Sequence, residues 1–599
     1  MKKKFVLDMI VICMIVFSLN NKITVKSSFS VREKKNGQFV INELSISPRL
    51  IDLSLTPREP IIITHDDNFT DYGFSGSGIL GDPYIIDSFS IETIETYGIY
   101  VNGTSKYFVI SNCYISAFSY GIYIVDVSEG TAVLDNNICG LHYYYSIYLS
   151  NSSGSIITDN YCYSTNMKIY NSFNVTLINN IFLEYSSALY IDYISDSKIM
   201  NNTFVDIQFP IIMTYSPNNT LMDNMCIDYC KAIRVENSLN STLIKNTCTM
   251  SGKYPDDHWL FGREGIVLEN SYGSKLMNNT CSNIDYGVVL LNSSESVLKN
   301  NNFYKCGLKI DDSDAEQLSL GYIIENNYVN EKEIGYFTNL NEYTISEPIY
   351  GQLFFINCDD IIIKNQEIPN TGQATGIYFG NCKKVDLEDN TFSCLYYAIR
   401  LNSTTEATLI NNYCYNNSIR IDYSHDSTII NNTLCHSGGL RIEDSSNLDI
   451  RENTFNNNSR GIYFGSSSYC LIVYNLFLEN AIYAITFAAY CNYNIIHHNS
   501  FINNNLEAVS EGGSQAADYG TNNTWYDVST NEGNYWNEWK SKKPYPIESN
   551  KEVTDPYPLN KNLKRASYGF TIFISAFVLM VILYRRYRNK KITHTRIKQ

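Results

Sequence analysis

The stretch Leu177-Ile-Asn-Asn-Ile-Phe182 returns along the chain as Ile199-Met-Asn-Asn-Thr-Phe204, Leu221-Met-Asp-Asn-Met-Cys226 and Leu243-Ile-Lys-Asn-Thr-Cys248. The Asn in its fourth position recurs every 20 to 25 residues, except across two gaps of 33 and 39 residues. A repeat of this length predicts a solenoid, because each unit must bury its inner face against its neighbours. The Asn suits a turn with left-handed backbone, and its amide can form a ladder with the next coil. The aligned positions are Asn112, Asn137, Asn160, Asn180, Asn202, Asn224, Asn246, Asn279, Asn301, Asn326, Asn365, Asn390, Asn412, Asn432, Asn453, Asn475 and Asn499.

A second short phrase lies about fourteen residues before each Asn. It reads GIYV at Gly98, AIRV at Ala232, GIVL at Gly265 and AIRL at Ala398. Apolar residues alternate with one variable residue, which is the period of a β-strand, and no helical period appears. Leucine-rich repeats have a similar length but need a dense leucine frame, which is missing here. The sequence therefore predicts an all-β, single-stranded right-handed parallel β-helix of about 17 coils.

Both ends of the chain carry apolar segments outside the repeat. Lys2 to Lys4 and the apolar run from Phe5 to Leu19 are typical of a secretory signal or an N-terminal anchor. Tyr568 to Tyr584 is an uncharged apolar run before a basic segment, which predicts a transmembrane helix with a cytoplasmic tail or a processed sorting signal. We expect a signal peptide or anchor at 1–27, a lead-in at 28–59, the β-helix at 60–525, a cap and proline-containing linker at 526–566, the transmembrane helix at 567–584 and the tail at 585–599.

This order predicts a single-pass protein of the cell membrane, with the β-helix outside the cell and the C-terminus in the cytoplasm. The formal net charge is −16, of which the basic tail contributes a net +7 and the first eight residues a net +2. Residues 9–584 therefore carry a net charge of −25. A surface this acidic excludes nucleic acid as the expected partner.

The chain contains 16 cysteines, and Cys13 lies in the N-terminal apolar run. The other fifteen are odd in number, and many alternate with Phe at one position of the repeat. This pattern is typical of small buried hydrophobic residues in an internal stack. Disulfides between neighbouring coils are the alternative. The residues concerned are Cys139, Cys162, Cys226, Cys248, Cys281 and Cys414.

The two long gaps indicate excursions from the rod. The first holds Lys253 to Glu264, and the second holds the stretch around Glu331 to Ile349. Long loops of a solenoid often gather on its binding face. The first excursion is suited to gripping a sugar ring or a metal, or it is a solvated loop that Trp259 anchors. Its polar and aromatic residues are Asp256, Asp257, His258, Trp259 and Arg263.

The central residue of each GIYV-type phrase should face away from the core, because its neighbours on both sides face inward. Residues two positions further on share that face, which brings Arg420 beside Asp422 and Arg441 beside Glu443. The row is either a ladder of ion pairs on a solvated face or a carbohydrate groove, where Tyr rings stack on sugars and Arg binds acidic groups. The predicted row is Tyr100, Tyr123, Tyr148, Tyr170, Tyr190, Ile212, Arg234, Val267, Val289, Lys309, Tyr378, Arg400, Arg420, Arg441, Tyr463 and Thr486.

Phrases outside the repeat carry a family resemblance. Ile61-Ile-Ile-Thr64 and Gly76 to Ile86 precede the coils, and Gly533-Asn-Tyr-Trp-Asn-Glu-Trp539 and Asp555-Pro-Tyr-Pro-Leu559 follow them. With the repeats between them, these phrases resemble the NosD family over roughly residues 60–560. The resemblance implies an extracytoplasmic right-handed β-helix with carbohydrate-binding or sugar-hydrolase type repeats. For the best-known members it implies a role in copper-site maturation beside an ABC transporter.

Metal binding does not transfer with that resemblance. Where the family has an Asp-Gly-rich loop suited to calcium, the interval Trp539 to Ile547 has three lysines. The only close histidine pair, His497-His498, would point to opposite faces of a strand, and copper motifs rich in Met or Cys are absent. We therefore expect neither a calcium site nor a copper site, and no cofactor.

Three function classes remain. The first is a surface protein that binds extracellular polysaccharide or cell-surface glycan, or acts in adhesion. The second is a polysaccharide lyase or glycoside hydrolase, which needs a base beside a charge-neutralising group or two carboxyls flanking one bond. The third is an accessory protein for copper-site maturation. The only catalytic candidates are Arg420, Asp422, Arg441, Glu443 and Asp444.

Overall fold

The computed structural model describes residues 33–34, 38–39, 55–128, 132–140, 145–251, 262–310, 321–368, 372–393 and 396–561. The predicted N-terminal signal, transmembrane helix and basic tail lie outside the described residues, as does Trp259. Within the part of the chain that is described, no helix has the length and apolar character of a membrane span.

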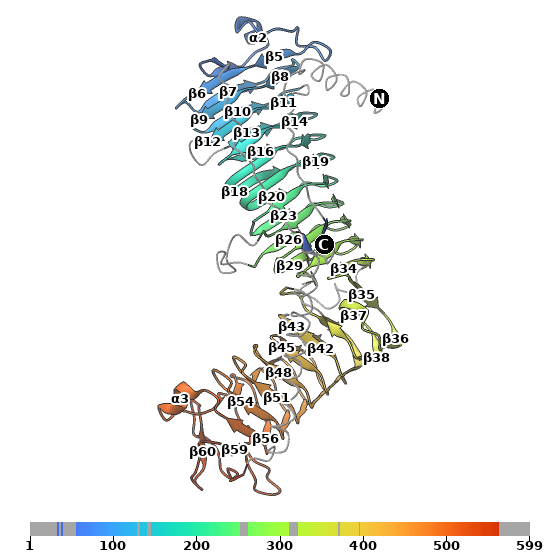
Figure 1. Cartoon of the computed structure of the whole chain (residues 1–599), viewed down its shortest axis with the longest axis vertical. Coiled ribbons are helices and arrows are strands. Elements are labelled where there is room, and N and C mark those ends of the chain that lie inside the picture. The colour runs from blue at the N-terminus through green and yellow to red at the C-terminus, as the bar shows by residue number, and fades with distance from the viewer. Residues whose placement is uncertain are drawn as a thin grey trace, which may run out of the picture.

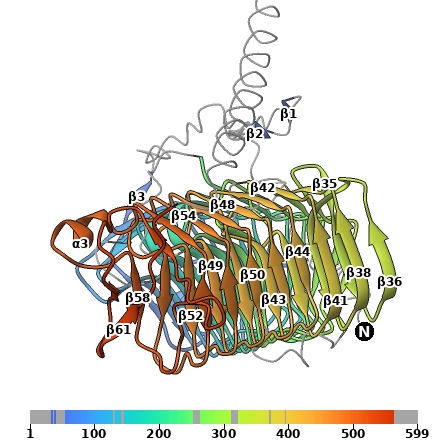
Figure 2. The ribbon, with the colours of Figure 1, turned by 90° about the horizontal axis from the view of Figure 1, so that it is seen from below.

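The described chain forms a right-handed parallel β-solenoid of about 17 turns, which confirms the predicted fold. Successive coils pair strand on strand in parallel, so the same repeat position returns directly above itself. Figure 1 shows that the rod consists of two stacks and changes direction between them, and Figure 2 shows the coils of the second stack side by side. We call residues 56–329 the first stack and residues 332–536 the second stack.

Each coil of the first stack contributes three columns of strands. The column that carries the predicted row is β4 (Ile61–Ile63), β7 (Tyr97–Asn102), β10 (Tyr120–Val125), β13 (Tyr145–Ser150), β16 (Asn166–Tyr170), β18 (Ile181–Asp192), β20 (Thr203–Thr214), β23 (Lys231–Glu236), β26 (Glu264–Glu269), β29 (Tyr286–Leu291) and β32 (Leu308–Ile310). The second column is an 11-stranded sheet of β5 (Tyr84–Asp87), β8 (Phe108–Ser111), β11 (Ala132–Leu134), β14 (Ile156–Thr158), β17 (Thr176–Ile178), β19 (Lys198–Met200), β21 (Thr220–Met222), β24 (Thr242–Ile244), β27 (Lys275–Met277), β30 (Val297–Lys299) and β33 (Ile323–Glu325). The third column is β3 (Thr56–Pro57), β6 (Phe89–Glu92), β9 (Tyr114–Ala117), β12 (Asn137–Gly140), β15 (Tyr161–Tyr163), β22 (Met225–Ile227), β25 (Thr247–Thr249), β28 (Thr280–Ser282), β31 (Asn302–Tyr304) and β34 (Tyr328–Val329), with β18 and β20 long enough to serve both outer columns.

The second stack repeats this plan. Its row-bearing column is β35 (Lys332–Thr338), β37 (Tyr350–Ile356), β40 (Ile377–Gly380), β43 (Tyr397–Asn402), β46 (Ser418–Asp422), β49 (Leu440–Glu443), β52 (Ile462–Gly465), β55 (Ile485–Phe487) and β58 (Ala516–Asp518). The second column is an 8-stranded sheet of β36 (Asn341–Ile345), β38 (Asp359–Lys364), β41 (Lys383–Glu388), β44 (Thr408–Ile410), β47 (Thr428–Ile430), β50 (Asp449–Arg451), β53 (Leu471–Val473) and β56 (Ile495–His497). The third column is also an 8-stranded sheet, of β39 (Glu367–Ile368), β42 (Thr391–Ser393), β45 (Tyr413–Tyr415), β48 (Thr433–Cys435), β51 (Thr454–Asn456), β54 (Leu476–Leu478), β57 (Ser500–Ile502) and β59 (Tyr535–Trp536). The remaining elements are β1 (Glu33–Lys34), β2 (Gln38–Phe39), α2 (Asn68–Asp71), α3 (Leu506–Ser510), β60 (Tyr545–Ile547) and β61 (Val553–Asp555).

The two stacks meet at an antiparallel hairpin, so the rod is not the single continuous helix that the sequence predicted. β34 pairs antiparallel with β35, and β35 then pairs in parallel with β37. The strand direction is therefore reversed, and the second core lies on the other face of the shared sheet. Phe354 and Tyr378 pack into the first core, whereas Phe355 and Phe379 pack into the second. The 39-residue gap marks this junction rather than a loop.

A ladder of buried Asn side chains runs through each stack. Asn180, Asn202, Asn224 and Asn246 lie in successive coils, and each Nδ2 donates to the next Oδ1 at 2.9–3.0 Å, as predicted. The second ladder begins at Gln366, whose backbone N–H donates to Asn390 Oδ1. The full ladders are Asn136, Asn160, Asn180, Asn202, Asn224, Asn246, Asn279, Asn301 and Asn327, then Gln366, Asn390, Asn412, Asn432, Asn453, Asn475, Asn499 and Asn534.

The left-handed backbone belongs to the residue before each ladder residue from Asn136 to Asn499, which corrects the expectation that one Asn serves both roles. Asn201 and Asp223 have φ of 55° and 53°, whereas Asn202 and Asn224 are not among the positive-φ residues. Four predicted ladder positions are wrong by one residue: Asn112, Asn326 and Asn365 are the left-handed turn residues, whereas Asn137 lies one residue after the ladder Asn. The corresponding ladder partners are Cys113, Asn136, Asn327 and Gln366.

The second ladder ends on a carboxylate from the last phrase of the resemblance. The backbone N–H of Asn534 donates to Asp555 Oδ2 at 2.7 Å, and Trp536 Nε1 donates to the same oxygen at 3.0 Å. Asp555 is fully buried, and a Cβ at Gly533 would lie 1.9 Å from its Oδ1. The two phrases that follow the repeats, Gly533 to Trp539 and Asp555 to Leu559, therefore close the end of the second stack.

The cysteines of the repeat lie in the core as free thiols, as predicted. Cys162, Cys226, Cys248, Cys281 and Cys414 have no exposed surface, and none forms a disulfide. The side chain of Cys139 lies outside the described part of the chain.

Candidate functional site

Six tyrosines form a patch on three consecutive coils at the start of the predicted row. Tyr100, Tyr123 and Tyr148 lie in register on β7, β10 and β13, and the rings of Tyr123 and Tyr148 stack with centroids 4.8 Å apart. All six side chains are half-buried. We call the set the six-tyrosine patch; it is Tyr97, Tyr100, Tyr120, Tyr123, Tyr145 and Tyr148.

The second half of this patch, Tyr97, Tyr120 and Tyr145, was not predicted. Residues three apart on a regular strand face opposite sides, so alternation placed Tyr97 inward. In the structure Gly98 and Ile99 are both buried, which breaks the alternation and leaves Tyr97 and Tyr100 on one face. A Cβ at Gly98 would approach Ile115 to 2.5 Å, so the strand needs glycine there. The recurring phrase YGIY, YGIY, YSIY is the signal that could have identified these residues.

The patch carries no charge at neutral pH. Burial, followed by the nearby Tyr148, Tyr120 and Tyr97 hydroxyls, raises the pKa of Tyr123 to about 12. Burial also raises the pKa of Tyr145. The patch is thus a largely apolar surface with neutral hydroxyl groups, which can both donate and accept hydrogen bonds.

Further along the first stack, the row differs in part from the prediction. Lys168, not Tyr170, lies in register between Tyr148 and Tyr190, and it forms an ion pair with Asp192 at 2.8 Å. Tyr170 lies two positions further on, in register with Asp192 and more exposed. Val267 and Val289 lie in the row but are buried.

Arg234 follows in the same row and binds two carboxylates. It forms ion pairs with Glu236 and, at 2.8 Å, with Glu269. Lys231 binds Glu264 at 2.9 Å beside them. These groups neutralise one another on the sheet.

In the second stack the predicted arginines form a ladder with the carboxylates between them. Arg400 and Arg420 both bind Asp422, at 3.4 and 2.7 Å. Arg420 also reaches Glu443 at 3.4 Å, and Arg441 pairs with the same carboxylate. These five side chains together carry one net positive charge. Of the two interpretations of the predicted row, a ladder of ion pairs therefore describes the geometry of these five side chains.

Aromatic rings flank this ladder. The guanidinium of Arg441 lies 5.2 Å from the ring centroid of Tyr463, and that of Arg400 lies 5.7 Å from Tyr378. Tyr378 is buried against the first core, so the prediction that it faces solvent is wrong. Asp444 is exposed at a turn with φ of 46°.

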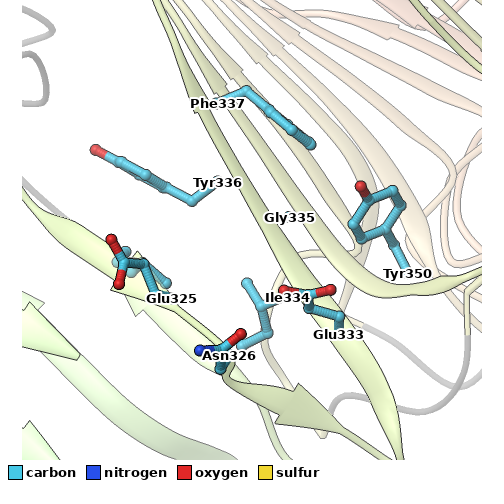
Figure 3. A pocket seen from close by; sticks show the side chains of 9 residues that line it. Glu325, Asn326, Glu333, Ile334, Gly335, Tyr336, Phe337 and Tyr350 are labelled. Carbon is cyan, nitrogen blue, oxygen red and sulfur yellow. The ribbon is translucent and has the colours of Figure 1, made fainter. Parts of the chain in front are cut away.

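A pocket lies at the junction of the two stacks. It has a volume of about 250 Å³ and is lined by Glu325, Glu333, Tyr336 and Tyr350, among others (Figure 3). Glu325 forms an ion pair with Lys299 at 2.9 Å. The pocket is a wide cleft at the end of the 11-stranded sheet, and its two carboxylates come from β33 and β35.

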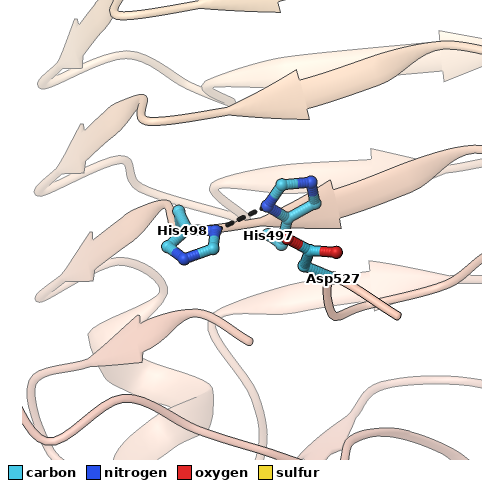
Figure 4. Close-up of side chains that lie close together, drawn as sticks. All are labelled: His497, His498 and Asp527. Atoms are coloured by element: carbon cyan, nitrogen blue, oxygen red, sulfur yellow. Dashed lines mark hydrogen bonds between the residues drawn. The ribbon is translucent and has the colours of Figure 1, made fainter. Parts of the chain in front are cut away.

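A histidine cluster lies near the last coil of the second stack. His497 Nδ1 and His498 Nδ1 are 2.6 Å apart, and an Asp527 carboxylate oxygen lies within 4.8 Å of a nitrogen of each ring (Figure 4). The prediction that the two rings point to opposite faces is wrong, because His498 has a left-handed backbone with φ of 55°. Two hydrogen bonds from Ser529 lower the pKa of Asp527 to about 2, and burial followed by His498 lowers the pKa of His497.

Two family models match the chain. Residues 341–541 match the family described as "Periplasmic copper-binding protein (NosD)". Residues 68–182, 97–224 and 168–329 match the "Right handed beta helix region". No curated protein sequence matches the chain significantly.

Several solved structures share distant similarity with the chain. The Streptococcus pneumoniae surface protein and adhesin PfbA is 12% identical over 70% of this chain and 100% of its own, with a TM-score of 0.26. The A-module of the Azotobacter vinelandii mannuronan C-5 epimerase AlgE4 is 11% identical over 71% and 98%, with a TM-score of 0.19. The PL6 family alginate lyase AlyGC is 9% identical over 80% and 95%, with a TM-score of 0.21. The family matches and the architecture confirm that this chain is a right-handed parallel β-helix protein, whose residues 341–541 are similar to NosD.

Proposed function

We propose that this protein binds extracellular polysaccharide or cell-surface glycan through the six-tyrosine patch, as a surface-binding or adhesion protein. The observation that carries the proposal is the pair of tyrosine rows on β7, β10 and β13. Coils repeat about every 4.8 Å, so each coil offers one pair of rings along the rod. A linear sugar chain can lie on such a surface, with its apolar ring faces on the aromatic rings and its hydroxyl groups on the tyrosine hydroxyls.

The charge pattern favours a neutral polymer over the acidic one that the sequence indicated. Arg400, Arg420 and Arg441 are occupied by Asp422 and Glu443, so little positive charge remains for a uronate or sulfate. The net charge of −25 on residues 9–584 also repels polyanions. The same ion pairs occupy Asp422 and Glu443, two of the three predicted catalytic carboxylates, and Asp444 lies exposed at a turn. We therefore assign no catalytic role to this cluster.

Replacement of Tyr100, Tyr123 and Tyr148 together by Ala should weaken binding of a neutral glycan about 100-fold, if each stacked ring contributes about 1 kcal/mol. The loss should not depend on salt, because no charge is removed. Titration of the full-length chain against glycans found by array screening measures this. Tyr469 and Tyr493 are the matched control, since their exposed rings also stack, 5.3 Å apart, on another face. Unchanged binding in the triple variant would exclude the patch as the site.

The arginine row gives a second arm of that experiment. Replacement of Arg400, Arg420 and Arg441 by Ala should leave binding of a neutral glycan unchanged and lower the stability of the second stack, because Asp422 is only 4% exposed and loses both partners. Weaker, salt-dependent binding in this variant would instead support an acidic ligand on the arginines.

The surface location belongs to the same proposal and rests on the N-terminal and C-terminal apolar runs of the sequence. Protease added to intact cells should remove the β-helix and spare a tag placed after Gln599, because a helix at 567–584 would hold the tail in the cytoplasm. Immunoblotting of the tag measures this. A tag lost to external protease would reverse the orientation, and a tag missing from the mature protein would indicate processing of the tail.

A further inference from the structure

The histidine cluster near the last coil has a geometry that a simple hydrogen-bonded pair does not require. His497 ends β56, and His498 occupies the left-handed turn position that Asn or Asp fills in most other coils. Because of this turn, consecutive side chains converge instead of alternating, and both Nδ1 atoms face one point (Figure 4). Asp527, from a loop 29 residues later in the sequence, brings a carboxylate to the same point.

The surroundings of His498 determine which of its nitrogens is free. Nε2 lies 2.8 Å from the Glu532 carboxylate and therefore carries the proton of the neutral ring. Its Nδ1 lone pair then faces His497. The backbone N–H of His498 donates to the Gly533 carbonyl at 2.8 Å, and its ring packs against Tyr474 at 5.1 Å. A carboxylate that binds the far nitrogen of a histidine is the usual support of a metal-ligating imidazole.

We propose that His497 Nδ1, His498 Nδ1 and an Asp527 carboxylate oxygen bind one divalent transition-metal ion, with Glu532 orienting His498. Two imidazoles and one carboxylate suit a borderline ion such as Zn²⁺, whereas calcium prefers oxygen ligands alone and copper(I) prefers sulfur. Three protein ligands leave at least one coordination position open. His497 and Asp527 are partly exposed, so an external ligand can reach the ion. All four residues lie within residues 341–541, which match the NosD model, and they lie outside the closing phrases of the sequence that carry the resemblance.

The test is titration of the metal-free full-length chain, purified without a polyhistidine tag, with Zn²⁺ by calorimetry. We expect one ion per chain, and we expect His497→Gln and Asp527→Asn each to lower the affinity at least tenfold. His425→Gln is the matched control, because the hydrogen bonds of the His425 ring are with Ser446. Glu532→Gln should keep the stoichiometry, lower the affinity about 10- to 100-fold and change the visible spectrum of bound Co²⁺.

Two results would overturn the site. One is saturable binding that persists unchanged in the His497→Gln, Asp527→Asn double variant. The other is no saturable binding of Zn²⁺ by the wild-type chain, in which case the two imidazoles share only a hydrogen bond. X-ray absorption at the zinc edge of the wild-type complex gives a further readout that needs no variant. It should show nitrogen and oxygen neighbours with imidazole scattering and no sulfur.

Discussion

Replacement of Asn224 by Leu should lower the free energy of unfolding of the first stack by about 3–5 kcal/mol, because several buried groups lose their partners at roughly 1–3 kcal/mol each. The Asn224 Nδ2 donates to Asn246 Oδ1 at 2.9 Å and to the Ile199 carbonyl at 2.8 Å. Its Oδ1 accepts from the backbone N–H and the Nδ2 of Asn202 at 3.1 and 3.0 Å. A leucine can replace none of these bonds, and a side chain only 1% exposed leaves no room for water to do so.

Hydrogen exchange of the backbone amides in β19, β21 and β24 is the suitable measurement, since a solenoid can open locally without unfolding as a whole. Asn201→Gly is the matched control. Asn201 is exposed, and its φ of 55° is one that glycine adopts freely, so this change should alter stability by less than about 1 kcal/mol. A comparable loss in both variants would mean that the turn, rather than the ladder, stabilises the coil.

The architecture could be predicted because the period and the burial of each repeat position are both visible in the sequence. The ladder positions Asn180 to Asn246 were correct for that reason. Where two polar residues adjoin, as at Asn136 and Asn137, the sequence does not tell which one turns inward. Asn and Asp suit both the left-handed turn and its neighbour. Cys113 and Gln366 occupy the first positions of the two ladders, where the sequence has no Asn that would mark the position.

The junction of the two stacks was misinterpreted as a loop, although its sequence contains a clue. Tyr350-Gly-Gln-Leu-Phe-Phe-Ile356 is a nearly continuous apolar run, which is typical of a strand that is buried on both faces. Strict alternation assigned one of the faces of this shared sheet to solvent, and Tyr378 was placed there. Because the hairpin at 329–332 reverses the chain, that face is instead covered by the first core.

The candidate sites depend on departures from regular strands, which is why the sequence revealed only part of them. Half of the six-tyrosine patch exists because Gly98 and Ile99 are both buried. The histidine cluster exists because His498 adopts a left-handed backbone. The ion-pair ladder, by contrast, follows from regular alternation and was foreseen at Arg420, Asp422 and Glu443. Trp259 remains a prediction.

Replacement of Asp555 by Ala should lower the free energy of unfolding of the second stack by about 3–5 kcal/mol, since it leaves several buried donors without an acceptor. The backbone N–H groups of Asn534 and Tyr557 donate to this carboxylate at 2.7 and 3.1 Å, and Trp536 Nε1 donates at 3.0 Å. Asp555 also closes the Asn ladder, so its loss exposes the end of the ladder to fraying. Tryptophan fluorescence during urea unfolding reports on this end, because Trp525, Trp536 and Trp539 lie here. The exposed Glu552 is the control, and Glu552→Ala should change little.

The pH dependence of that stability separates the charge of Asp555 from its hydrogen bonds. Burial raises the pKa of Asp555 above its ordinary value of 3.8, despite the bonds from Trp536 and Asn534. A carboxyl with a raised folded pKa stabilises the fold when protonated, and this contribution is fully present below the unfolded pKa and lost as pH rises through the folded pKa. The wild-type chain should therefore gain stability relative to Asp555→Asn as pH falls through the folded pKa toward 3.8. Urea unfolding of both proteins at several pH values measures the difference. Parallel pH profiles would mean that Asp555 is equally charged in the folded and unfolded chain, and that the cost of Asp555→Ala arises from its hydrogen bonds alone.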